Sequence, residues 1–553
     1  MPTKRWIFPE PSIDRAASGL KPSELAILER RGLSSAREIE SFLNRQYDGE
    51  VDPFQLSDMD RAVERLQAAR RAGERVVVYG DYDADGTTAT ALLVQVLRSI
   101  GLDTGWYIPN RFSEGYGLNK PALGEIRRSG TAVVVSVDCG VRANEVVEAA
   151  NASGLELIIT DHHLPGAELP PAIAVINPNR ADDNYPFKGL AGVGLAYKLA
   201  QGLVASSGGE NLKKYLDLVA VGTVADLAPL VDENRYLVGA GLEQLNLRAR
   251  PGLRALSEFA GYAEGSITSS SIGFGLGPRL NAAGRLADAR LAVELLLSTD
   301  GSDVWNNASK LDGLNRERRQ LTDETLERAR SIAQEQGDLL VAAEKSFHEG
   351  VVGLVAGRLA DEFYRPALVA RIEENELRGS ARSIPEFHIT KALQACDDLL
   401  LRYGGHAQAA GFALLEENLE AFTIRLSELA ADSLAGLDLR PRLEIDASVG
   451  FDELDDDLMA FIDRLQPCGQ ANPDPVFATA GVEVLSKRAV GQGGKHLKLT
   501  LRHTGRIFDA IAFGFGDQSG KLPGRIDLAY RLERNEFRGV VSLQLNAQDF
   551  RLP

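Results

Sequence analysis

The feature that most constrains this chain is a short acidic stretch directly after an apolar run. The run, Val76–Tyr79, ends at Gly80, and a segment with the composition of a helix, Thr87–Leu93, follows shortly afterwards. This pattern predicts a buried strand, a loop and a helix. Like charges on one short loop raise one another's pKa, so the arrangement is favourable mainly where a divalent cation neutralises them. The loop carries three alternate carboxylates, Asp81, Asp83 and Asp85.

Two other interpretations of this loop compete with a metal site. Asp-x-Asp-x-Asp-Gly also opens the calcium-binding loop of an EF-hand, but that loop follows a helix and has a bidentate glutamate at its twelfth position, where this chain has Leu92. The EF-hand is therefore excluded. A solvated acidic turn remains open as an alternative when this stretch is considered alone.

Further apolar runs downstream also read as strands, and two of them end on acidic residues. Thr104–Pro109, Thr131–Val137 and Leu155–Thr160 alternate with helical segments. Such alternation predicts a parallel sheet with right-handed crossovers, in which ligands gather beyond the carboxyl ends of the strands. The residues expected at that edge are Asp81, Asp83, Asp85, Asp138, Asp161, His162 and His163.

The types of these side chains indicate which metal they suit. Carboxylates mixed with imidazole favour manganese or magnesium over structural zinc, which prefers thiolates. Asp226 follows the apolar helical run Leu216–Val224 and is a further candidate ligand. Taken alone, Asp226 is better explained as a helix-end carboxylate.

Composition places the chain among ordinary globular proteins with several domains. It has 553 residues, 44% hydrophobic and 25% charged, enough for three or four domains. The cysteines Cys139, Cys396 and Cys468 are far apart and give neither a disulfide framework nor a zinc spacing. The amino terminus lacks an apolar signal core, and no apolar run reaches about twenty residues. We therefore expect a reducing compartment, a cytoplasmic location and no membrane partner.

Charge is distributed unevenly along the chain. The net charge of −17 argues at first against a nucleic-acid partner, because a polyanion is usually met by a basic surface. Residues 481–553, however, hold 12 Lys and Arg against 7 Asp and Glu. Basic and apolar residues interleave there, so one face of each strand can be basic while the other is core. The strand-like runs are Val482–Val490, His496–His503, Ile507–Phe515, Ile526–Glu533 and Val540–Phe550.

The middle of the chain reads as a long helix followed by a second α/β unit. Ser302–Gln336 keeps its apolar residues near one side, as in a helix that bridges two domains. Arg378–Ser383 reads as a small-residue turn whose backbone amides, hydroxyls and guanidinium suit a terminal phosphate. The other elements expected in this unit are strands at Leu339–Ala342, Ala367–Ile372 and Leu377–Ala381 and a helix at Gly353–Phe363.

Together these stretches resemble the DHH phosphoesterase family, and the downstream sequence is similar to its RecJ-type members. The resemblance runs from about residue 50 to the end, and its motifs are weak singly but specific in combination. It implies an α/β fold: a parallel-sheet DHH domain and a smaller α/β DHHA1 domain joined by a long helix, followed by an OB-type β-barrel. The motifs are Gly80–Gly86, Arg111–Asn119, Asp161–His163, Gly277–Arg285, His348–Gly353 and Gly404–Phe412.

The residues and the resemblance together give expected domain boundaries. Residues 1–50 are expected to be a helical N-terminal segment, with helices at Ser23–Arg31 and Ser35–Arg45. The DHH domain would cover 51–300, the connecting helix 301–337, the DHHA1 domain 338–437 and the OB-fold domain 438–553.

Carried over residue by residue, the resemblance implies two divalent cations, Mn²⁺ or Mg²⁺, with Asp138 as the bridging ligand. Asp161 and His163 would complete the catalytic site by orienting ligands or touching the scissile phosphate. The chain departs from the family pattern at Ala381, where glycine is usual. The implied metal ligands are Asp81, Asp83, Asp85, Asp138, His162 and Asp226. The implied substrate-binding residues are Arg111, Ser380 and Arg382 at a 5′-phosphate, with Tyr116, Arg279, Asn281 and His406 as further contacts.

The function that the resemblance implies is degradation of single-stranded DNA from a 5′-phosphate, in the 5′→3′ direction, to mononucleotides. The expected setting is DNA repair and recombination, with single-strand-binding protein or other repair proteins as candidate partners. Two alternatives remain. The first is a phosphodiesterase acting on short oligonucleotides or dinucleotides, which would not need the basic C-terminal segment. The second is a non-catalytic DNA-binding scaffold, which would be expected to have lost metal ligands, whereas every ligand position is filled here.

Overall fold

The computed structural model describes residues 4–9, 19–45, 51–207, 211–333, 337–537 and 539–552. The chain divides into two compact units. The first unit comprises Arg45–Arg319 and Pro467–Pro473, and the second comprises Met1–Asn44, Gln320–Gln466 and Asp474–Pro553. In the described part of the chain, no helix is long and apolar enough to span a membrane.

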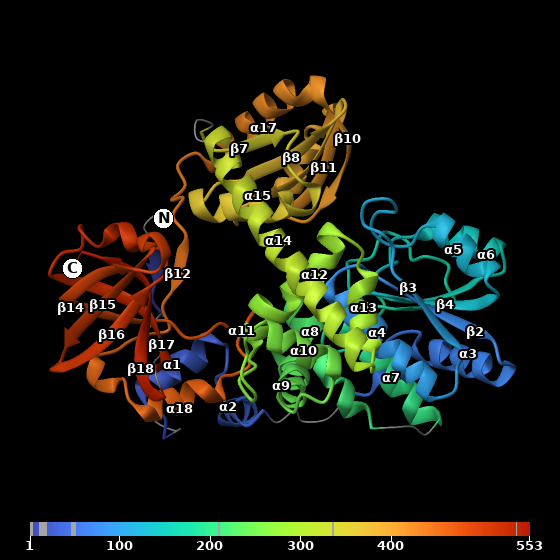
Figure 1. Cartoon of the computed structure of the whole chain (residues 1–553), viewed down its shortest axis with the longest axis horizontal. Helices are drawn as coiled ribbons and strands as arrows, with labels where there is room; N and C mark the ends of the chain where they lie inside the picture. The colour runs from blue at the N-terminus through green and yellow to red at the C-terminus, as the bar shows by residue number, and fades with distance from the viewer. Residues whose placement is uncertain are drawn as a thin grey trace. The chain divides into compact units, whose positions relative to one another are not determined.

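A five-stranded parallel sheet lies at the centre of the first unit (Figure 1). Its strand order is β3-β2-β4-β5-β6, and all four pairings are parallel. The sequence predicted four of these strands and missed the short β6. The strands are β2 (Arg75–Gly80), β3 (Thr104–Tyr107), β4 (Thr131–Val137), β5 (Glu156–Thr160) and β6 (Ala174–Ile176).

Helices cover both faces of this sheet, as crossovers between parallel strands require. Successive side chains of a strand point to opposite faces. Val76 and Val78 therefore pack into one core cluster, while Val77 and Tyr79 pack into another. The first cluster includes α3 (Met59–Ala72), α4 (Ala84–Ser99) and α7 (Gly192–Ser207), and the second includes α5 (Lys120–Arg128) and α6 (Asn144–Ala152).

The rest of the first unit is helical. The glycine-rich stretch before Arg279 forms a π-helical turn, Ile272–Leu276, that continues directly into α12. The long helix expected at Ser302–Gln336 is observed as α14 (Gly301–Ala333), and the boundary between the two units falls within it. Residues 334–336 lie outside the described part. The other helices are α8 (Leu216–Ala225), α9 (Asp232–Asn246), α10 (Pro251–Phe259), α11 (Ser269–Ser271), α12 (Gly277–Leu286) and α13 (Arg290–Leu297).

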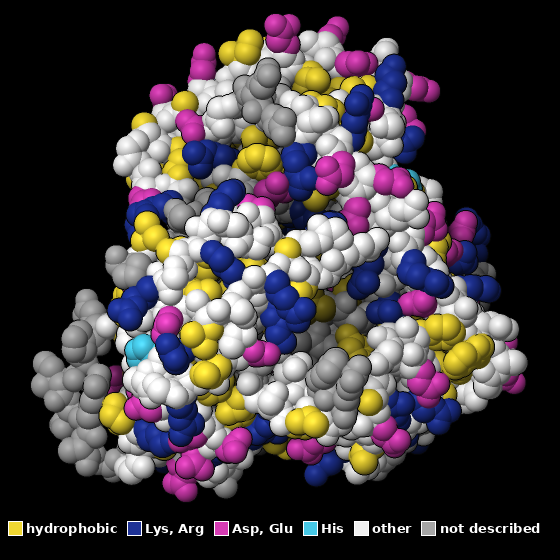
Figure 2. Space-filling view, turned by 60° about the vertical axis from the view of Figure 1, so that its left-hand side comes forward, with side chains coloured by type: hydrophobic (Ala, Val, Ile, Leu, Met, Phe, Trp, Pro, Cys, Tyr) yellow, Lys and Arg dark blue, Asp and Glu magenta, His cyan; other side chains and the backbone are white. Residues whose placement is uncertain are grey.

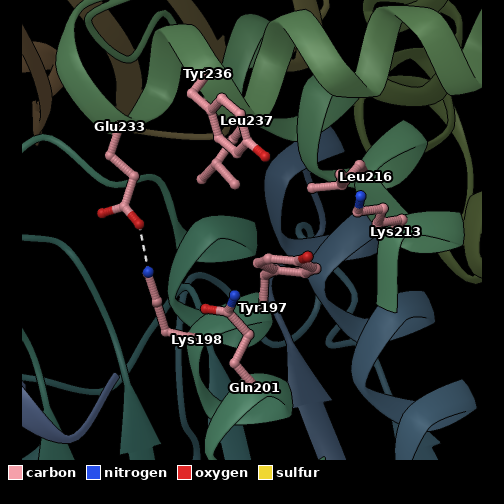
Figure 3. Close-up of a pocket in the computed structure, with 8 residues that line it drawn as sticks. All are labelled: Tyr197, Lys198, Gln201, Lys213, Leu216, Glu233, Tyr236 and Leu237. Carbon is pink, nitrogen blue, oxygen red and sulfur yellow. Dashed lines mark ion pairs between the residues drawn. The ribbon is translucent and has the colours of Figure 1, made fainter. Parts of the chain in front are cut away.

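A buried ion pair joins α7 to α9. Figure 3 shows the ammonium group of Lys198 facing the carboxylate of Glu233, and their side chains are 1% and 2% exposed. Lys198 also donates to the carbonyl of Val51 at 3.0 Å, and Glu233 accepts from the hydroxyl of Tyr185 at 2.6 Å. Buried charges persist only when such partners are present. The pocket around the pair is lined by Tyr197, Gln201, Lys213, Leu216, Tyr236 and Leu237.

The second unit contains a mixed five-stranded sheet in the order β10-β11-β9-β8-β7, in which only β7 and β8 run parallel. Helices α15 (Glu349–Phe363), α16 (Ile389–Gln394) and α17 (Leu419–Leu434) accompany it. The strands are β7 (Leu340–Glu344), β8 (Ala367–Glu373), β9 (Glu376–Arg382), β10 (Leu400–Gly405) and β11 (Ala409–Leu415).

Two expectations overlap in this sheet, and one of them is wrong. The strand predicted at Leu377–Ala381 is confirmed as part of β9. The small-residue turn predicted at Arg378–Ser383 is not observed, because all except its last residue belongs to β9. Strand β9 pairs on both sides, with β8 and with β11, so its backbone amides are used within the sheet and are not offered to a phosphate. These pairings are non-local, so the small residues alone do not show them.

The C-terminal part of the second unit is a closed five-stranded barrel, as expected. The strands pair in the order β14-β15-β16-β18-β17, and β17 returns to β14. Short β13 (Ala447–Ser448) pairs in parallel with the start of β14, and α18 (Asp456–Arg464) precedes the barrel. The strands are β14 (Phe477–Val490), β15 (His496–His503), β16 (Arg506–Ala512), β17 (Arg525–Phe537) and β18 (Val540–Arg551).

Basic side chains on the surface of this barrel form ion pairs with acidic ones. Lys498 pairs with Asp509 at 3.0 Å, and Arg502 pairs with Glu483 at 2.7 Å. On the molecular face in Figure 2, Lys and Arg side chains are likewise interspersed with Asp, Glu and apolar side chains. The excess of positive charge in this segment is therefore partly offset by neighbouring carboxylates.

The N-terminal segment is helical where the sequence predicted helices, at α1 (Pro22–Arg30) and α2 (Ala36–Leu43). It also contains a strand that was not predicted, β1 (Arg5–Ile7), which pairs in parallel with β12 (Arg442–Glu444). Residues 1–3, 10–18 and 46–50 of the expected segment lie outside the described part. The expected domain boundaries remain predictions, while the three-part fold class is confirmed.

Candidate metal centre

The acidic loop after β2 is compact, and its backbone passes close to the start of α4. Asp81 follows the last residue of the strand, Gly80, and is 3% exposed. Asp83 caps α4 by accepting the N–H of Gly86 at 3.0 Å. A Cβ atom at Gly86 would lie 2.6 Å from the backbone nitrogen of Asp81. Glycine is therefore required at position 86 for the loop to close.

Asp138 lies at the end of β4 in a left-handed backbone conformation, with φ of +62°. Such a conformation is costly for a residue other than glycine and tends to occur at functional sites. Its N–H donates to the carbonyl of Thr160 at 2.9 Å. The first turn of α7 packs against it so closely that a Cβ atom at Gly192 would lie 2.6 Å from the Cβ of Asp138. The backbone thus fixes this carboxylate at the sheet edge.

Asp85 is held by the N-terminus of α7. Its two carboxylate oxygens accept the N–H groups of Gly192 at 2.6 Å and Val193 at 2.8 Å. A helix N-terminus stabilises negative charge through its unpaired N–H groups and its dipole. Each oxygen keeps a second lone pair, so the contact orients Asp85 without preventing it from binding a cation.

Asp161 and His163 form a hydrogen-bonded pair beside the carboxylates. Asp161 accepts from the Nδ1 atom of His163 at 2.7 Å and from the N–H of Val141 at 2.9 Å. Burial acts to raise the pKa of Asp161, but the hydrogen bond and charge of His163 outweigh it and the pKa is lowered. Burial opposes a charge on His163 as well, yet the bond to Asp161 leaves its pKa raised. The pair is therefore a carboxylate that orients an imidazole.

His162 differs from its neighbour in charge and in partners. Burial, followed by the proximity of His163, lowers the pKa of His162 to about 4, so its imidazole is neutral at pH 7. Its Nε2 atom lies 3.1 Å from Oδ1 of Asp138 and 3.7 Å from Oδ2 of Asp226. A neutral imidazole nitrogen directed at two carboxylates is suited to bind a metal ion.

The donor set fits divalent cations. Oδ1 of Asp81, Oδ1 of Asp138 and Nε2 of His162 are buried and have no hydrogen-bond partner among the described residues. Burial of polar atoms without partners is unfavourable, and a bound cation removes that cost. Within the described residues, atoms that lie within 4.8 Å of one another form three groups: Asp81, Asp83 and Asp138; Asp85, His162 and Asp226; and Asp138, His162 and His163.

The pKa values of the carboxyl groups point the same way. Burial first and neighbouring carboxylates second raise the pKa values of Asp81, Asp85 and Asp138 well above the usual range. Burial and the charge of Asp83 raise the pKa of Asp226 to about 7. Carboxylates packed this closely need a positive charge to stay ionised together. Asp226 thus joins the cluster and is more than the helix-end carboxylate that its local sequence indicated.

Arg111 and Tyr116 also lie beside the cluster. The guanidinium of Arg111 lies 5.1 Å from the centre of the Tyr82 ring. The hydroxyl of Tyr116 donates to the carbonyl of Asp138 at 3.3 Å and lies 3.4 Å from Nδ1 of His163. Tyr116 is 55% exposed, so its ring borders the cluster and remains accessible.

Arg279 and Asn281, both on α12, are engaged within the protein. Arg279 is 8% exposed, and its guanidinium donates to Asp312 at 3.0 Å and to the carbonyl of Gly275 at 2.9 Å. Oδ1 of Asn281 accepts the N–H of Ala84 at 2.8 Å and so supports the acidic loop. These contacts give both residues a structural part, and their expected contacts with substrate remain predictions.

The other three predicted substrate residues lie in the second unit. Arg382 donates to the hydroxyl of Ser380 at 2.7 Å, and both face Gly353 on α15, where a Cβ atom would lie 3.1 Å from that hydroxyl and 3.2 Å from the guanidinium. Glycine at position 353 therefore leaves room for the two groups beside α15. His406 is exposed between β10 and β11, and its N–H donates to the carbonyl of Ala409, the residue paired with Arg382.

The sequence did not identify the residues that hold the ligands in place. Gly192 and Val193 bind Asp85, and Gly222 passes so close that a Cβ atom would lie 2.8 Å from Oδ1 of Asp85. Tyr82 lies under Arg111. Local sequence carried one usable signal, the glycines of Gly192-Val193-Gly194 at the start of an apolar helical run.

Comparison with known proteins agrees with this geometry. Residues 75–223 match the DHH family, N-terminal domain, residues 336–432 match the DHHA1 domain, and residues 445–549 match the RecJ OB domain. The chain is 37% identical over 557 residues to the single-stranded-DNA-specific exonuclease RecJ of Bacillus subtilis, covering 99% of this chain and 70% of the relative. It is 38% identical over 561 residues to RecJ of Escherichia coli, covering 95% and 96% respectively.

Solved structures give the same result. The crystal structure of RecJ from Thermus thermophilus in complex with Mn²⁺ superposes with a TM-score of 0.86 at 30% identity, covering 99% of this chain and 80% of that one. The Mg²⁺ complex from the same organism gives a TM-score of 0.81 at 29% identity, covering 99% and 78%. The matched domains, the identity along nearly the whole chain and the arrangement of the acidic cluster together show that this chain belongs to the RecJ family of single-stranded-DNA-specific exonucleases.

Proposed function

We propose that this protein hydrolyses single-stranded DNA from a 5′-phosphorylated end, in the 5′→3′ direction, and releases mononucleotides with the help of two divalent cations. The observation that carries the proposal is the convergence of Oδ1 of Asp81, Oδ1 of Asp138 and Nε2 of His162, buried without hydrogen-bond partners among the described residues. Burial of these atoms without partners is unfavourable unless a cation binds them. The substrate and the metals named for the relatives support the same reading.

The proposed ligands are Asp81, Asp83, Asp85, Asp138, His162 and Asp226, with Mn²⁺ or Mg²⁺ as the cations. When bound, a pair of such ions lowers the pKa of water and stabilises charge on the phosphoryl and leaving oxygens. Asp138 belongs to two of the three ligand groups and is the proposed bridge. Its fixed backbone and the contact of Gly192 hold it in one position, which favours a precise arrangement of ligands.

Asp161 and His163 are proposed to act on the substrate side. Asp161 keeps the Nδ1 atom of His163 protonated and its pKa raised, so the imidazole can donate a hydrogen bond to the scissile phosphate. Arg111 provides a fixed positive charge near the cluster, because Tyr82 lies under its guanidinium. Tyr116 offers an accessible ring for a sugar or a base.

Ser380 and Arg382 are proposed to recognise the 5′-phosphate, as is Arg111. His406 is proposed to contact a phosphate of the substrate. A guanidinium hydrogen-bonded to a hydroxyl, with both side chains only partly buried, offers several donors to one anion. The donors would be side chains, because the amides of β9 are used in the sheet. The C-terminal barrel is proposed to track the rest of the strand.

The biological setting belongs to the proposal too. We place the protein in the cytoplasm, in DNA repair and recombination, where single-strand-binding protein or other repair proteins are candidate partners. The competing readings are a phosphodiesterase for short oligonucleotides and a non-catalytic scaffold. The filled ligand positions argue against the scaffold, and a complete barrel argues against the shorter enzyme.

The test compares substrates that differ in one property. Rates are measured on 5′-phosphorylated, 5′-hydroxyl and duplex DNA of the same sequence, and on a dinucleotide. The proposal predicts fast turnover of the first substrate alone. Equal rates on the dinucleotide and the long strand would favour the shorter enzyme, and binding without turnover would favour the scaffold.

A further inference from the structure

One exposed apolar side chain follows directly after the candidate ligand Asp226. Leu227 is 71% exposed. Within Leu216–Leu230, a stretch that the structure describes completely, it is the only exposed residue. Single exposed leucines are common on protein surfaces, so exposure alone would need no explanation. The backbone and the neighbours of Leu227 are less ordinary.

The backbone of Leu227 is left-handed, with φ of +60°. Helix α8 ends there: the N–H of Leu227 donates to the carbonyl of Val224 at 3.2 Å, and the N–H of Ala228 donates to Thr223 at 3.1 Å. This helix ending normally uses glycine, or sometimes asparagine, because a branched side chain is strained in that conformation. Glycine would satisfy the fold, so the leucine needs a reason outside the fold.

The position of Leu227 supplies that reason. Consecutive Cα atoms lie about 3.8 Å apart, so its side chain starts one residue away from a carboxylate of the cluster. That carboxylate, of Asp226, lies 3.7 Å from Nε2 of His162. Tyr116, whose hydroxyl contacts the backbone of Asp138, is a second exposed side chain with apolar surface at this cluster. An accessible aromatic ring therefore lies at the cluster, and Leu227 follows one of its carboxylates directly in the chain.

We propose that Leu227 is a positioning residue that packs against a nucleobase of the bound strand next to the scissile phosphate. The inference rests on the proposed function and adds a contact that the metal cluster does not provide. An apolar contact with the face of an unpaired base tolerates every sequence, as an exonuclease requires. In a duplex the same face is stacked and inaccessible, so the contact also favours single strands.

The contact is tested by combining a change in the enzyme with a change in the substrate. The wild type and Leu227→Gly are compared on 5′-phosphorylated single strands in which an abasic nucleotide occupies the first, second or third position. On normal DNA, Leu227→Gly should lower kcat/KM about tenfold, the loss expected for an apolar contact of leucine size. With the abasic nucleotide at one of the three positions, the kcat/KM of the wild type should fall to that of Leu227→Gly on normal DNA. The kcat/KM of Leu227→Gly should not change at that position.

Three variants separate the contact from a structural role. Leu227→Asn, which tolerates the left-handed backbone, should show the same loss as glycine, and Leu227→Met should retain most activity. Leu247→Gly is the matched control. Leu247 is 69% exposed and follows α9, whose length places it about 22 Å from Asp232 at the start of that helix. The Leu247→Gly variant should keep wild-type rates. The melting temperature of Leu227→Gly should be unchanged or higher, because strain is removed.

Two results would overturn the inference. One is a wild-type rate for Leu227→Gly on normal DNA. The other is an equal loss on normal DNA and at every abasic position, which would mean that Leu227 acts through the fold. If the wild type itself fails to degrade single-stranded DNA, the proposed function fails, and the comparison shows this separately because it includes wild type on normal DNA.

Discussion

Replacement of Lys198 by methionine should strongly destabilise the first unit, although the new side chain is apolar and of similar length. The side chain of Lys198 is 1% exposed, and its ammonium group pairs with Glu233 and donates to the carbonyl of Val51 at 3.0 Å. The side chain of Glu233 is 2% exposed. In the variant its carboxylate loses the ammonium group and keeps the hydrogen bond from the hydroxyl of Tyr185. A buried charge that loses its ionic partner costs about 3–5 kcal/mol.

The magnitude can be tested with a double-mutant cycle. Urea unfolding of the full chain, followed by circular dichroism, should show the first unit destabilised by about 3–5 kcal/mol in Lys198→Met. The double variant Lys198→Met/Glu233→Leu removes both charges and should recover most of that loss, since apolar replacement of a buried pair is often neutral. The recovery would show as a return of the urea midpoint towards that of the wild type.

A surface pair provides the control. Lys120 and Glu145 lie 3.9 Å apart with side chains 54% and 91% exposed, so Lys120→Met should change stability by less than about 1 kcal/mol. A loss below about 1 kcal/mol in Lys198→Met would refute the reasoning. So would a double variant as unstable as the single one, because the cost would then not arise from an unpaired charge.

Three further predictions concern the site. Asp138→Ala should abolish cleavage and leave strand binding, measured by fluorescence anisotropy, largely intact; loss of both would mean that the residue holds the fold. Gly192→Ala should weaken Mn²⁺ binding about tenfold to hundredfold in calorimetry, because the new Cβ atom would lie 2.6 Å from the Cβ of Asp138; unchanged affinity would show that the contact is slack. Arg382→Ala should reduce the preference for a 5′-phosphate over a 5′-hydroxyl about tenfold to hundredfold in kcat/KM, as expected for lost charged hydrogen bonds; an unchanged ratio would remove Arg382 from phosphate recognition.

Much of the fold could be predicted because its signals are local. β2, β4 and β5 are β-branched runs that end on aspartates, and the alternation of strands and helices determines that these ends share one edge. Asp81, Asp138 and Asp161 were placed together on that basis, and the structure brings them to the same edge. The barrel strands were equally visible in their alternating pattern.

The features that the sequence did not show depend on contacts between distant residues, and the substrate contact expected of Arg279 remains a prediction. β6 has three residues and is recognisable only by its pairing with β5. Arg279 is paired with Asp312, 33 positions away, and no local pattern shows that partner. Gly192 on α7 packs closely against Asp138, and its role in positioning that carboxylate depends on a steric contact that cannot be recognised in the sequence.

The most direct test of the account uses 5′-phosphorylated single-stranded DNA labelled separately at each end, with Mn²⁺, with Mg²⁺ and with chelator. We predict early release of labelled mononucleotide from the 5′ end, late release of the 3′ label, and no release after chelation, because Asp81, Asp138 and His162 then lack the cation that they are arranged to bind. Degradation that persists in chelator, or that begins at the 3′ end, would contradict the account.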